Sequence, residues 1–250
     1  MALRLIRSLV GGFNQDPQDQ PPQDMEAAVD LAMMFDTTGS MYCYLRKVRN
    51  KLRKIAGDVA RSHSDNHIGV IAFGDYCDRD RPYVVTHHPL SGDLASVQRF
   101  VENVDRTGGG DFPEAVEEAL HTANALKWRK NCPRVAVLVG DAPPHGVIDP
   151  RSKCEDGHFY IDEAKDLKRR GVVVYAVQCG DAPPTTKAFT EIARITGGKH
   201  LMLEQIDDLP ELIVAACKHR TGDLKGYVAE LEKEGRVTGR LKRQLATLED

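Results

Sequence analysis

Oxygen-bearing side chains gather in three short stretches of this 250-residue chain, and their types and spacing suggest chemistry. The first stretch follows an apolar run and reads Asp36-Thr37-Thr38-Gly39-Ser40. The second covers 107–114 and reads Thr-Gly-Gly-Gly-Asp-Phe-Pro-Glu. The third follows another apolar run and reads Gly140-Asp141-Ala142-Pro143-Pro144. Each stretch combines oxygen donors with glycines or prolines, the residues that shape tight turns.

These stretches offer the ligands that a hard divalent cation requires. Asp36, Thr38 and Ser40 present a carboxylate and two hydroxyls at alternate positions, and Asp111 and Glu114 add carboxylates from the second stretch. Mg²⁺ prefers a few such oxygen ligands and retains several waters. Ser40 taken alone could equally cap the helix that follows it. The three stretches together predict a metal site for Mg²⁺, with Mn²⁺ or Ca²⁺ as alternatives.

Apolar periodicity predicts strands and helices in alternation. Short apolar runs indicate strands at 27–35, 67–73, 83–86, 134–139, 172–178 and 200–203. Helical spacing of apolar residues indicates helices at 41–63, 94–104, 113–126, 161–170, 185–196 and 209–219. This order predicts an α/β fold, a doubly wound, mostly parallel six-stranded sheet with helices on both faces. Ligands of such a sheet bind beyond the carboxyl ends of its strands.

The chain divides into three parts by composition. Residues 1–24 combine a short amphipathic segment with a linker rich in proline and glutamine, and residues 25–219 form the domain. Residues 220–250 form a charged tail with a thin apolar stripe at helical spacing. That tail is expected to dock on its own domain, to self-associate or to meet a partner.

Charge and cysteine usage limit the functional class. A net charge of −3 gives no general attraction to nucleic acid, and no apolar run reaches the roughly 18 residues of a membrane span. The six cysteines contain no Cys-x-x-Cys pair, which indicates reduced thiols in a cytoplasmic protein. Cys132, Cys179 and Cys217 are expected in the core. A disulfide between Cys43 and Cys77 is the minority alternative.

Other residue groups give weaker signals. His145, Cys154 and His158 could be imagined as zinc ligands, but their spacing matches no standard site. His87-His88 is interpreted as a solvated turn before a proline. The glycines of 108–110 lack the Lys-Ser/Thr of a phosphate-binding loop, and no nucleophile elbow is present in the sequence. The chain is therefore not expected to be an enzyme.

The three stretches, in this order on alternating strands and helices, resemble the von Willebrand factor A domain and its metal-ion-dependent adhesion site. The resemblance covers roughly 27–219 and implies a Rossmann-like fold. The first motif of the family is Asp-x-Ser-x-Ser, and here Thr38 replaces the middle serine and keeps a hydroxyl. The resemblance implies that Asp36, Thr38 and Ser40 face the ion. It also implies that Asp141 contributes to the metal site, often indirectly through a bound water molecule.

The second stretch departs from the usual family pattern. Many members place a threonine just before the helix, where this chain has Phe112, which cannot ligate a metal. The Asp-x-Pro-Glu string resembles the integrin β-subunit version, in which the glutamate is the ligand. Glu114 or Asp111 is therefore the candidate, with Thr107 third.

The resemblance implies a protein-binding module in which the ion takes an aspartate or glutamate carboxylate from a partner protein. The strings around Asp36 and Asp141 are also similar to those of intracellular members, including some joined to atypical kinases. One alternative is a Mg²⁺-dependent hydrolase or phosphatase using Asp36, Asp111 and Asp141. Another is an assembly factor that works with an ATPase.

Overall fold

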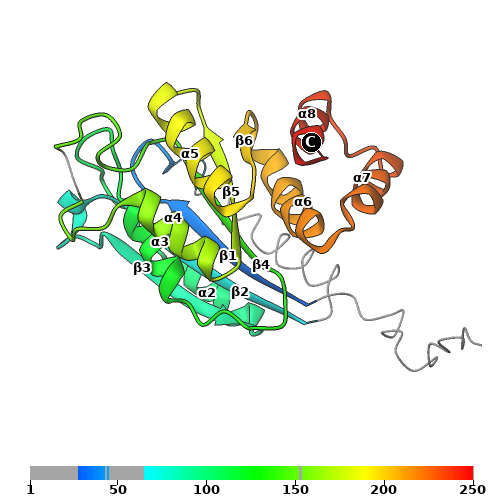
Figure 1. Ribbon diagram of the computed structural model, residues 1–250, viewed down its shortest axis with the longest axis horizontal. Helices are drawn as coiled ribbons and strands as arrows, with labels where there is room; N and C mark the ends of the chain where they lie inside the picture. The colour runs from blue at the N-terminus through cyan, green and yellow to red at the C-terminus, as the bar shows by residue number, and fades with distance from the viewer. Residues whose placement is uncertain (1–27, 43, 45–64, 152–153, 250) are drawn as a thin grey trace, which may run out of the picture.

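A six-stranded β-sheet runs through the middle of the molecule in the order β3-β2-β1-β4-β5-β6 (Figure 1). The computed structural model describes residues 28–42, 44, 65–151 and 154–249. All neighbouring strands are parallel except β2 and β3, which are antiparallel. This topology confirms the predicted doubly wound, mostly parallel sheet. The strands are β1 Val29–Asp36, β2 Asn66–Phe73, β3 Val85–Ser91, β4 Arg134–Gly140, β5 Val172–Cys179 and β6 His200–Leu203.

The central strand β1 is buried along its whole length because helices cover both faces of the sheet. Successive side chains of a strand point to opposite faces. Leu31 and Met33 accordingly belong to one apolar core, and Ala32 and Met34 belong to the other. A continuous apolar strand is what a sheet with two covered faces requires.

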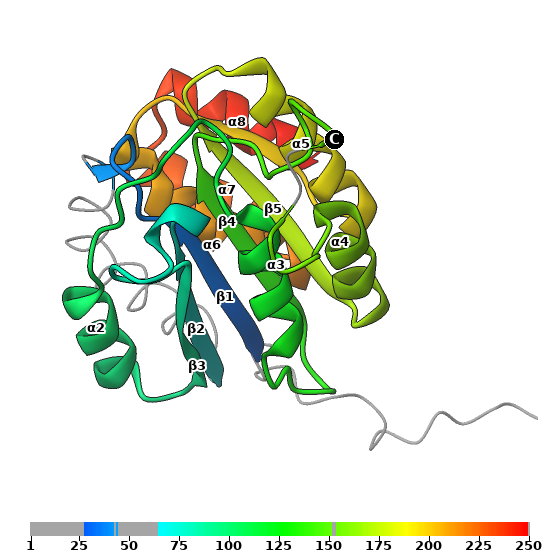
Figure 2. The same cartoon turned by 90° about the vertical axis from the view of Figure 1, so that its left-hand side faces the viewer.

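The helices form the two outer layers. Helices α3, α4 and α5 contribute to one core, and α2, α6, α7 and α8 contribute to the other. Figure 2 shows α3 and α4 on the near face of the sheet and α6 behind it. No helix in the described part of the chain has both the length and the apolar composition needed to cross a bilayer. The bounds are α2 Leu94–Asn103, α3 Val116–Ala125, α4 Tyr160–Arg169, α5 Pro183–Thr196, α6 Leu209–Thr221, α7 Leu224–Lys233 and α8 Gly239–Glu249.

Two sequence predictions concern segments that the structure does not describe. The N-terminal part, 1–24, lies outside the described residues, and so does most of the helix predicted at 41–63. The other predicted helices correspond to described ones, with shifts at their ends.

The third strand corrects the interpretation of His87 and His88 as a turn. Both histidines lie within β3, opposite Ile71 and Val70 of β2. Among the described strands β3 pairs with β2 alone and stands at the edge of the sheet, and its side chains are half-buried or exposed. An edge strand tolerates polar residues and a proline, here Pro89, because one side of its backbone lacks a partner strand.

The charged tail packs on the domain as α7 and α8. Leu231, Leu241 and Leu248 are buried in the same core as the inner side of α6. The Gln244 side chain accepts a hydrogen bond of 2.9 Å from the Met202 backbone N–H in β6. The sequence left three possibilities for the tail: docking on its own domain, self-association or binding a partner. In the structure the tail docks on its own domain. The boundary at residue 219 remains a prediction.

Candidate metal centre

The first and third oxygen-rich stretches meet because they follow β1 and β4, which are parallel and end at the same edge of the sheet. The second stretch, between α2 and α3, reaches the same edge, where the Thr107 N–H donates to the Thr37 carbonyl at 3.1 Å. Backbone hydrogen bonds join them there. The Gly39 N–H donates to the Gly108 carbonyl at 3.3 Å, and the Glu114 N–H donates to the Pro143 carbonyl at 3.0 Å. A groove of about 390 Å³ opens between them. Its lining includes Thr38, Ser40, Asp111, Phe112, Glu114 and Asp141.

Asp36 lies at the end of β1 and is 1% exposed. Its Oδ1 accepts hydrogen bonds from the Thr38 backbone N–H at 2.8 Å and from the Thr38 hydroxyl at 2.6 Å. Its Oδ2 has no hydrogen-bond partner among the described residues. Burial, with a further contribution from the charge of Asp141, raises the pKa of Asp36 to about 7. The free oxygen of a buried carboxylate is a strong position for a cation.

Glu114 is the second buried carboxylate of the site, with 4% exposure. Its Oε2 also lacks a hydrogen-bond partner in the part of the chain that the structure describes. Burial, followed by the charges of Asp36 and Asp75, raises the pKa of Glu114 to about 10. Such a shift means that the folded protein opposes a negative charge here unless a positive charge balances it.

The position of Glu114 differs from the sequence prediction. The helix expected from residue 113 begins at Val116. Glu114 instead forms a short parallel bridge with Pro144, which fixes it between the second and third stretches. The Glu114 N–H donates to the Pro143 carbonyl and the Ala115 N–H donates to the Gly74 carbonyl, both at 3.0 Å, so these residues pair across the fold and the helix starts after them.

Asp141 supplies the third such oxygen. Its Oδ1 is buried and has no hydrogen-bond partner within the described ranges, and the Thr185 hydroxyl donates to its backbone carbonyl at 2.9 Å. Three carboxylates therefore aim unsatisfied oxygens into one region. Mutual repulsion and lost hydration make this arrangement costly without a cation. The all-oxygen donor set fits Mg²⁺ and similar hard ions.

The remaining candidates take different positions. The Ser40 hydroxyl lies 3.4 Å from the Thr38 hydroxyl, at the rim of the groove. Thr107 is buried, and its hydroxyl lies 3.1 Å from the Thr37 hydroxyl, outside the groove lining. Asp111 is exposed and lies beside Asp75 and His145. Of the three candidates in the second stretch, Glu114 is therefore better placed than Thr107 or Asp111 to contact an ion in the groove.

Gly109 is required by the shape of the second stretch. Its φ of 73° lies in the left-handed region that favours glycine. A Cβ placed on it would lie 2.8 Å from the Glu114 Oε1. The glycine therefore leaves room for the glutamate carboxylate.

Sequence reasoning missed the residue that holds this glycine stretch in place. Asp78 accepts hydrogen bonds from the Gly108 N–H at 2.8 Å and from the Gly109 N–H at 3.0 Å. It lies in a short 3₁₀ helix, Tyr76–Asp78, just after β2. The signal was present, since Gly-Asp-Tyr-Cys-Asp follows β2 as polar residues follow the other strands.

The fold and the site together define a class: a doubly wound α/β domain with buried carboxylates gathered at the carboxyl edge of its sheet. The family model of the von Willebrand factor type A domain matches residues 30–213. The chain belongs to the von Willebrand factor type A domain family. Domains of this family are protein-interaction modules.

Known proteins with similar sequences are much longer than this chain. An ariadne-like RING finger protein of Acanthamoeba polyphaga mimivirus is 30% identical over 198 residues, covering 74% of this chain and 19% of that protein. The alpha-protein kinase vwkA of Dictyostelium discoideum is 31% identical over 121 residues, covering 48% of this chain and 19% of the kinase. The chain thus spans about a fifth of the length of these curated relatives.

A solved structure supports the fold. Proximal thread matrix protein 1 from the mussel byssus, with a zinc-occupied metal-ion-dependent adhesion site, superposes with a TM-score of 0.57 at 17% identity. The match covers 77% of this chain and 46% of that one.

Proposed function

We propose that this chain is a protein-binding module that takes a carboxylate of its partner on a bound divalent cation, Mg²⁺. One observation supports this most strongly. The Asp36 Oδ2, Glu114 Oε2 and Asp141 Oδ1 atoms are buried without hydrogen-bond partners among the described residues, and Glu114 and Asp141 line the groove. These carboxylates, with the Thr38 and Ser40 hydroxyls, would hold the ion.

When bound, the cation would supply positive charge and a coordination position that a partner carboxylate can occupy. Glu114 tunes this attraction, since each further direct carboxylate makes the ion less positive. A site that includes Glu114 should therefore hold a partner carboxylate less tightly than a site with Asp36 as its main anion. Its advantage is a higher affinity for the ion itself.

The rim of the groove supports a protein partner. Phe112 is 46% exposed beside the groove. The Arg106 guanidinium lies 4.0 Å from the centre of the Tyr42 ring. Both residues line a second hollow of about 880 Å³, which also includes Thr38 in its lining. Exposed aromatic residues and arginines are enriched at protein interfaces, and arginine complements an acidic partner.

Self-association through the C-terminal helices is less favoured than binding to a different protein. The apolar residues of α7 and α8 are buried on the same domain, as for Leu231 and Leu245. A cytoplasmic location is proposed on the cysteines, because the five that the structure describes are free thiols. Cys179 and Cys217 are in the core as expected, whereas Cys132 is half-buried.

The test uses Mn²⁺ as the ion and sodium acetate as the carboxylate probe. Water relaxation should show Mn²⁺ bound to the wild-type chain with exchangeable waters, and acetate should displace part of that water signal. Asp36→Ala should lose bound Mn²⁺ while keeping its circular dichroism spectrum. Bound Mn²⁺ whose waters do not respond to acetate would contradict carboxylate capture.

Two further measurements refine the proposal. The zinc-occupied site of the mussel protein supports including Zn²⁺ with Mg²⁺ and Mn²⁺ in a competition titration. A phosphatase assay with and without Mg²⁺ separates a binding module from the hydrolase alternative. Mg²⁺-dependent turnover that is lost in Asp36→Ala would favour the hydrolase.

A further inference from the structure

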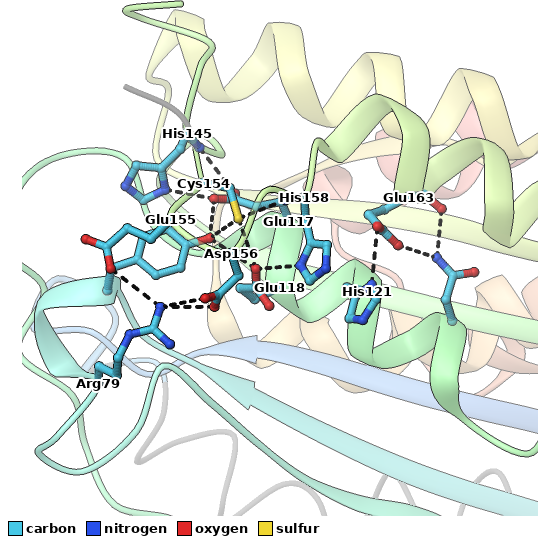
Figure 3. A network of polar contacts seen from close by, with 12 residues as sticks. Arg79, Glu117, Glu118, His121, His145, Cys154, Glu155, Asp156, His158 and Glu163 are labelled. Carbon is cyan, nitrogen blue, oxygen red and sulfur yellow. Dashed lines mark hydrogen bonds and ion pairs between the residues drawn. The ribbon is translucent and has the colours of Figure 1, made fainter. Parts of the chain in front are cut away.

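A second group of metal-binding side chains lies apart from the oxygen-rich groove. Glu118, Cys154 and His158 converge beside α3 (Figure 3). The Cys154 Sγ lies 3.0 Å from the Glu118 Oε1, and the His158 Nδ1 lies 2.7 Å from the same oxygen. One ligand atom from each of the three residues lies within 4.8 Å of the others.

The chain is shaped to bring these residues together. Glu118 lies in the first turn of α3, while Cys154 and His158 belong to the long connection between β4 and α4. Gly157, with a φ of 84°, turns the backbone so that its N–H donates to the Cys154 carbonyl at 3.2 Å. The His158 N–H then donates to the Cys154 Sγ at 3.1 Å. A Cys-x-x-x-His segment thus presents both side chains to one glutamate.

This grouping differs from the one that the sequence suggested. His145 does not join Cys154 and His158, because its Nδ1 lies 3.0 Å from a Glu117 oxygen and its Nε2 lies 3.3 Å from an Asp75 oxygen. Glu118, rather than His145, is the third member of the group with Cys154 and His158. The pairing could not be read from the sequence, since Glu118 and Cys154 are 36 residues apart.

We propose that Glu118, Cys154 and His158 form a Zn²⁺ site. A thiolate, an imidazole and a carboxylate are the ligands that Zn²⁺ takes in proteins, and the thiolate disfavours Mg²⁺ and Ca²⁺. Cys154 and Glu118 are 7% and 6% exposed, so two of the three ligands are shielded from bulk water. The metal would join a long, irregular connection to α3.

A hollow opens beside two of the three proposed ligands. Cys154 and His158 line a cavity of about 380 Å³, together with Phe159. Three protein ligands beside an open space are typical of a zinc that keeps water or an outside ligand, whereas closed structural sites use four protein ligands. The proposed site therefore leaves room for water or a small anionic ligand.

Neighbouring groups would orient the ligands. The Tyr76 hydroxyl donates towards the Cys154 Sγ at 2.8 Å. The His121 ring stacks on the His158 ring, with centroids 3.7 Å apart and planes inclined by 12°. Such supporting contacts fix ligand geometry and tune affinity.

A competing triad shares His158 but is a poorer site. His121, His158 and Glu163 also lie within reach of one ion. That set has no sulfur, and its His121 is exposed. Glu163 is already engaged, because the Asn124 amide donates to its Oε2 at 2.9 Å. The buried thiol makes the Glu118 triad the more selective one.

The experiment uses Co²⁺ as a spectroscopic substitute for Zn²⁺ on the full chain, under reductant and with excess Mg²⁺. A cobalt–thiolate bond gives a charge-transfer absorption that oxygen ligands cannot give. The oxygen-rich groove has no sulfur among its proposed ligands, but the Cys77 thiol lies next to Gly110 in the groove lining, so a Cys77→Ser variant is needed to assign the band to Cys154. Zn²⁺ should abolish the band by displacement, and wild-type protein should show it.

Variants identify the ligands. Cys154→Ser should remove the band, and His158→Asn and Glu118→Gln should each weaken Co²⁺ affinity at least ~10-fold. Cys77→Ser and Cys132→Ser are matched controls that should keep it, since both are free thiols elsewhere. Asp36→Ala should also keep the band, so failure of the groove and failure of this site give different results.

Thermal melts with a chelator show whether each variant still folds. With excess Mg²⁺ present to occupy the oxygen-rich groove, Zn²⁺ should raise the melting temperature of the wild type and leave that of Cys154→Ser unchanged. The proposal is overturned if wild-type protein shows no thiolate band. It is equally overturned if the band survives Cys154→Ser or disappears in Cys77→Ser.

Discussion

Two clusters of potential metal ligands lie near the start of α3, and they differ in how their carboxylates are hydrogen-bonded. In the groove, Asp36, Glu114 and Asp141 each leave a buried oxygen without a partner among the described residues. In the second cluster, the Glu118 Oε1 accepts from the Cys154 thiol and lies 2.7 Å from the His158 Nδ1. The first cluster needs a cation to balance its charge, whereas the second is satisfied by its own side chains. Only the first should be strained when metal is removed.

The largest expected effect is the loss of Mg²⁺ binding in Asp36→Ala. The Oδ2 of Asp36 is buried without a hydrogen-bond partner among the described residues, so this substitution would delete the proposed main anionic ligand. Calorimetric titration should show at least a ~100-fold loss of Mg²⁺ affinity, since a direct ligand is worth no less than the supporting groups that cost 10–100-fold. Glu118→Gln is the matched control in the second cluster and should keep wild-type affinity.

Stability without metal should change in opposite directions in the two clusters. In EDTA, Asp36→Asn should raise the unfolding free energy by about 1–3 kcal/mol, because it removes an unbalanced buried charge. Glu118→Gln should lower it by a similar amount, because the groups around the Glu118 Oε1 would meet a neutral amide oxygen, which accepts hydrogen bonds more weakly than a carboxylate. Urea denaturation measures both. Changes of the same sign in the two variants would break the comparison.

The second stretch sharpens the ligand assignment. Glu114→Gln should weaken Mg²⁺ binding roughly 10-fold, more than Asp111→Asn, and Thr107→Val should have the least effect. This ranking follows from the contacts of each side chain. Glu114 has a buried oxygen without a hydrogen-bond partner among the described residues, whereas the Thr107 hydroxyl contacts the Thr37 hydroxyl. Calorimetry on the three variants tests it. A larger loss in Thr107→Val would show that this chain follows the threonine pattern of the family.

The smallest effect is expected at the rim of the groove. Phe112→Ala should change Mg²⁺ affinity by less than about twofold, because surface substitutions away from buried polar groups change little. The ring is 46% exposed, which suits contact with a partner. The same titration checks this, with Asp36→Ala as the contrasting variant. A large loss would mean that the ring shapes the ion site.

The sequence predicted the sheet, and the positions of Asp36 and Asp141 at strand ends, because those signals are local. Buried parallel strands read as continuous apolar runs, and Asp36 and Asp141 follow such runs directly. The start of α3 was predicted three residues early, since the bridge between Glu114 and Pro144 is a contact across the fold. A local pattern contains no information about such a contact.

The second cluster shows the same limit more strongly. Cys154 and His158 are close in sequence, but the third ligand comes from α3, and only the folded connection brings it near. His87 and His88 were misread for a related reason, because an edge strand of half-exposed polar residues lacks the apolar run that marks a buried strand. In both cases the outcome depends on contacts between segments that are distant in the sequence.

Crystals of the full chain grown with Mn²⁺, analysed by anomalous scattering, test the central claim most directly. The account predicts a peak in the groove within about 2.0–2.6 Å of carboxylate oxygens of Asp36 or Glu114, the range for hard-cation ligands. Asp36→Ala crystals under the same conditions should lack that peak. A wild-type map with no anomalous peak among Asp36, Glu114 and Asp141 would contradict the account.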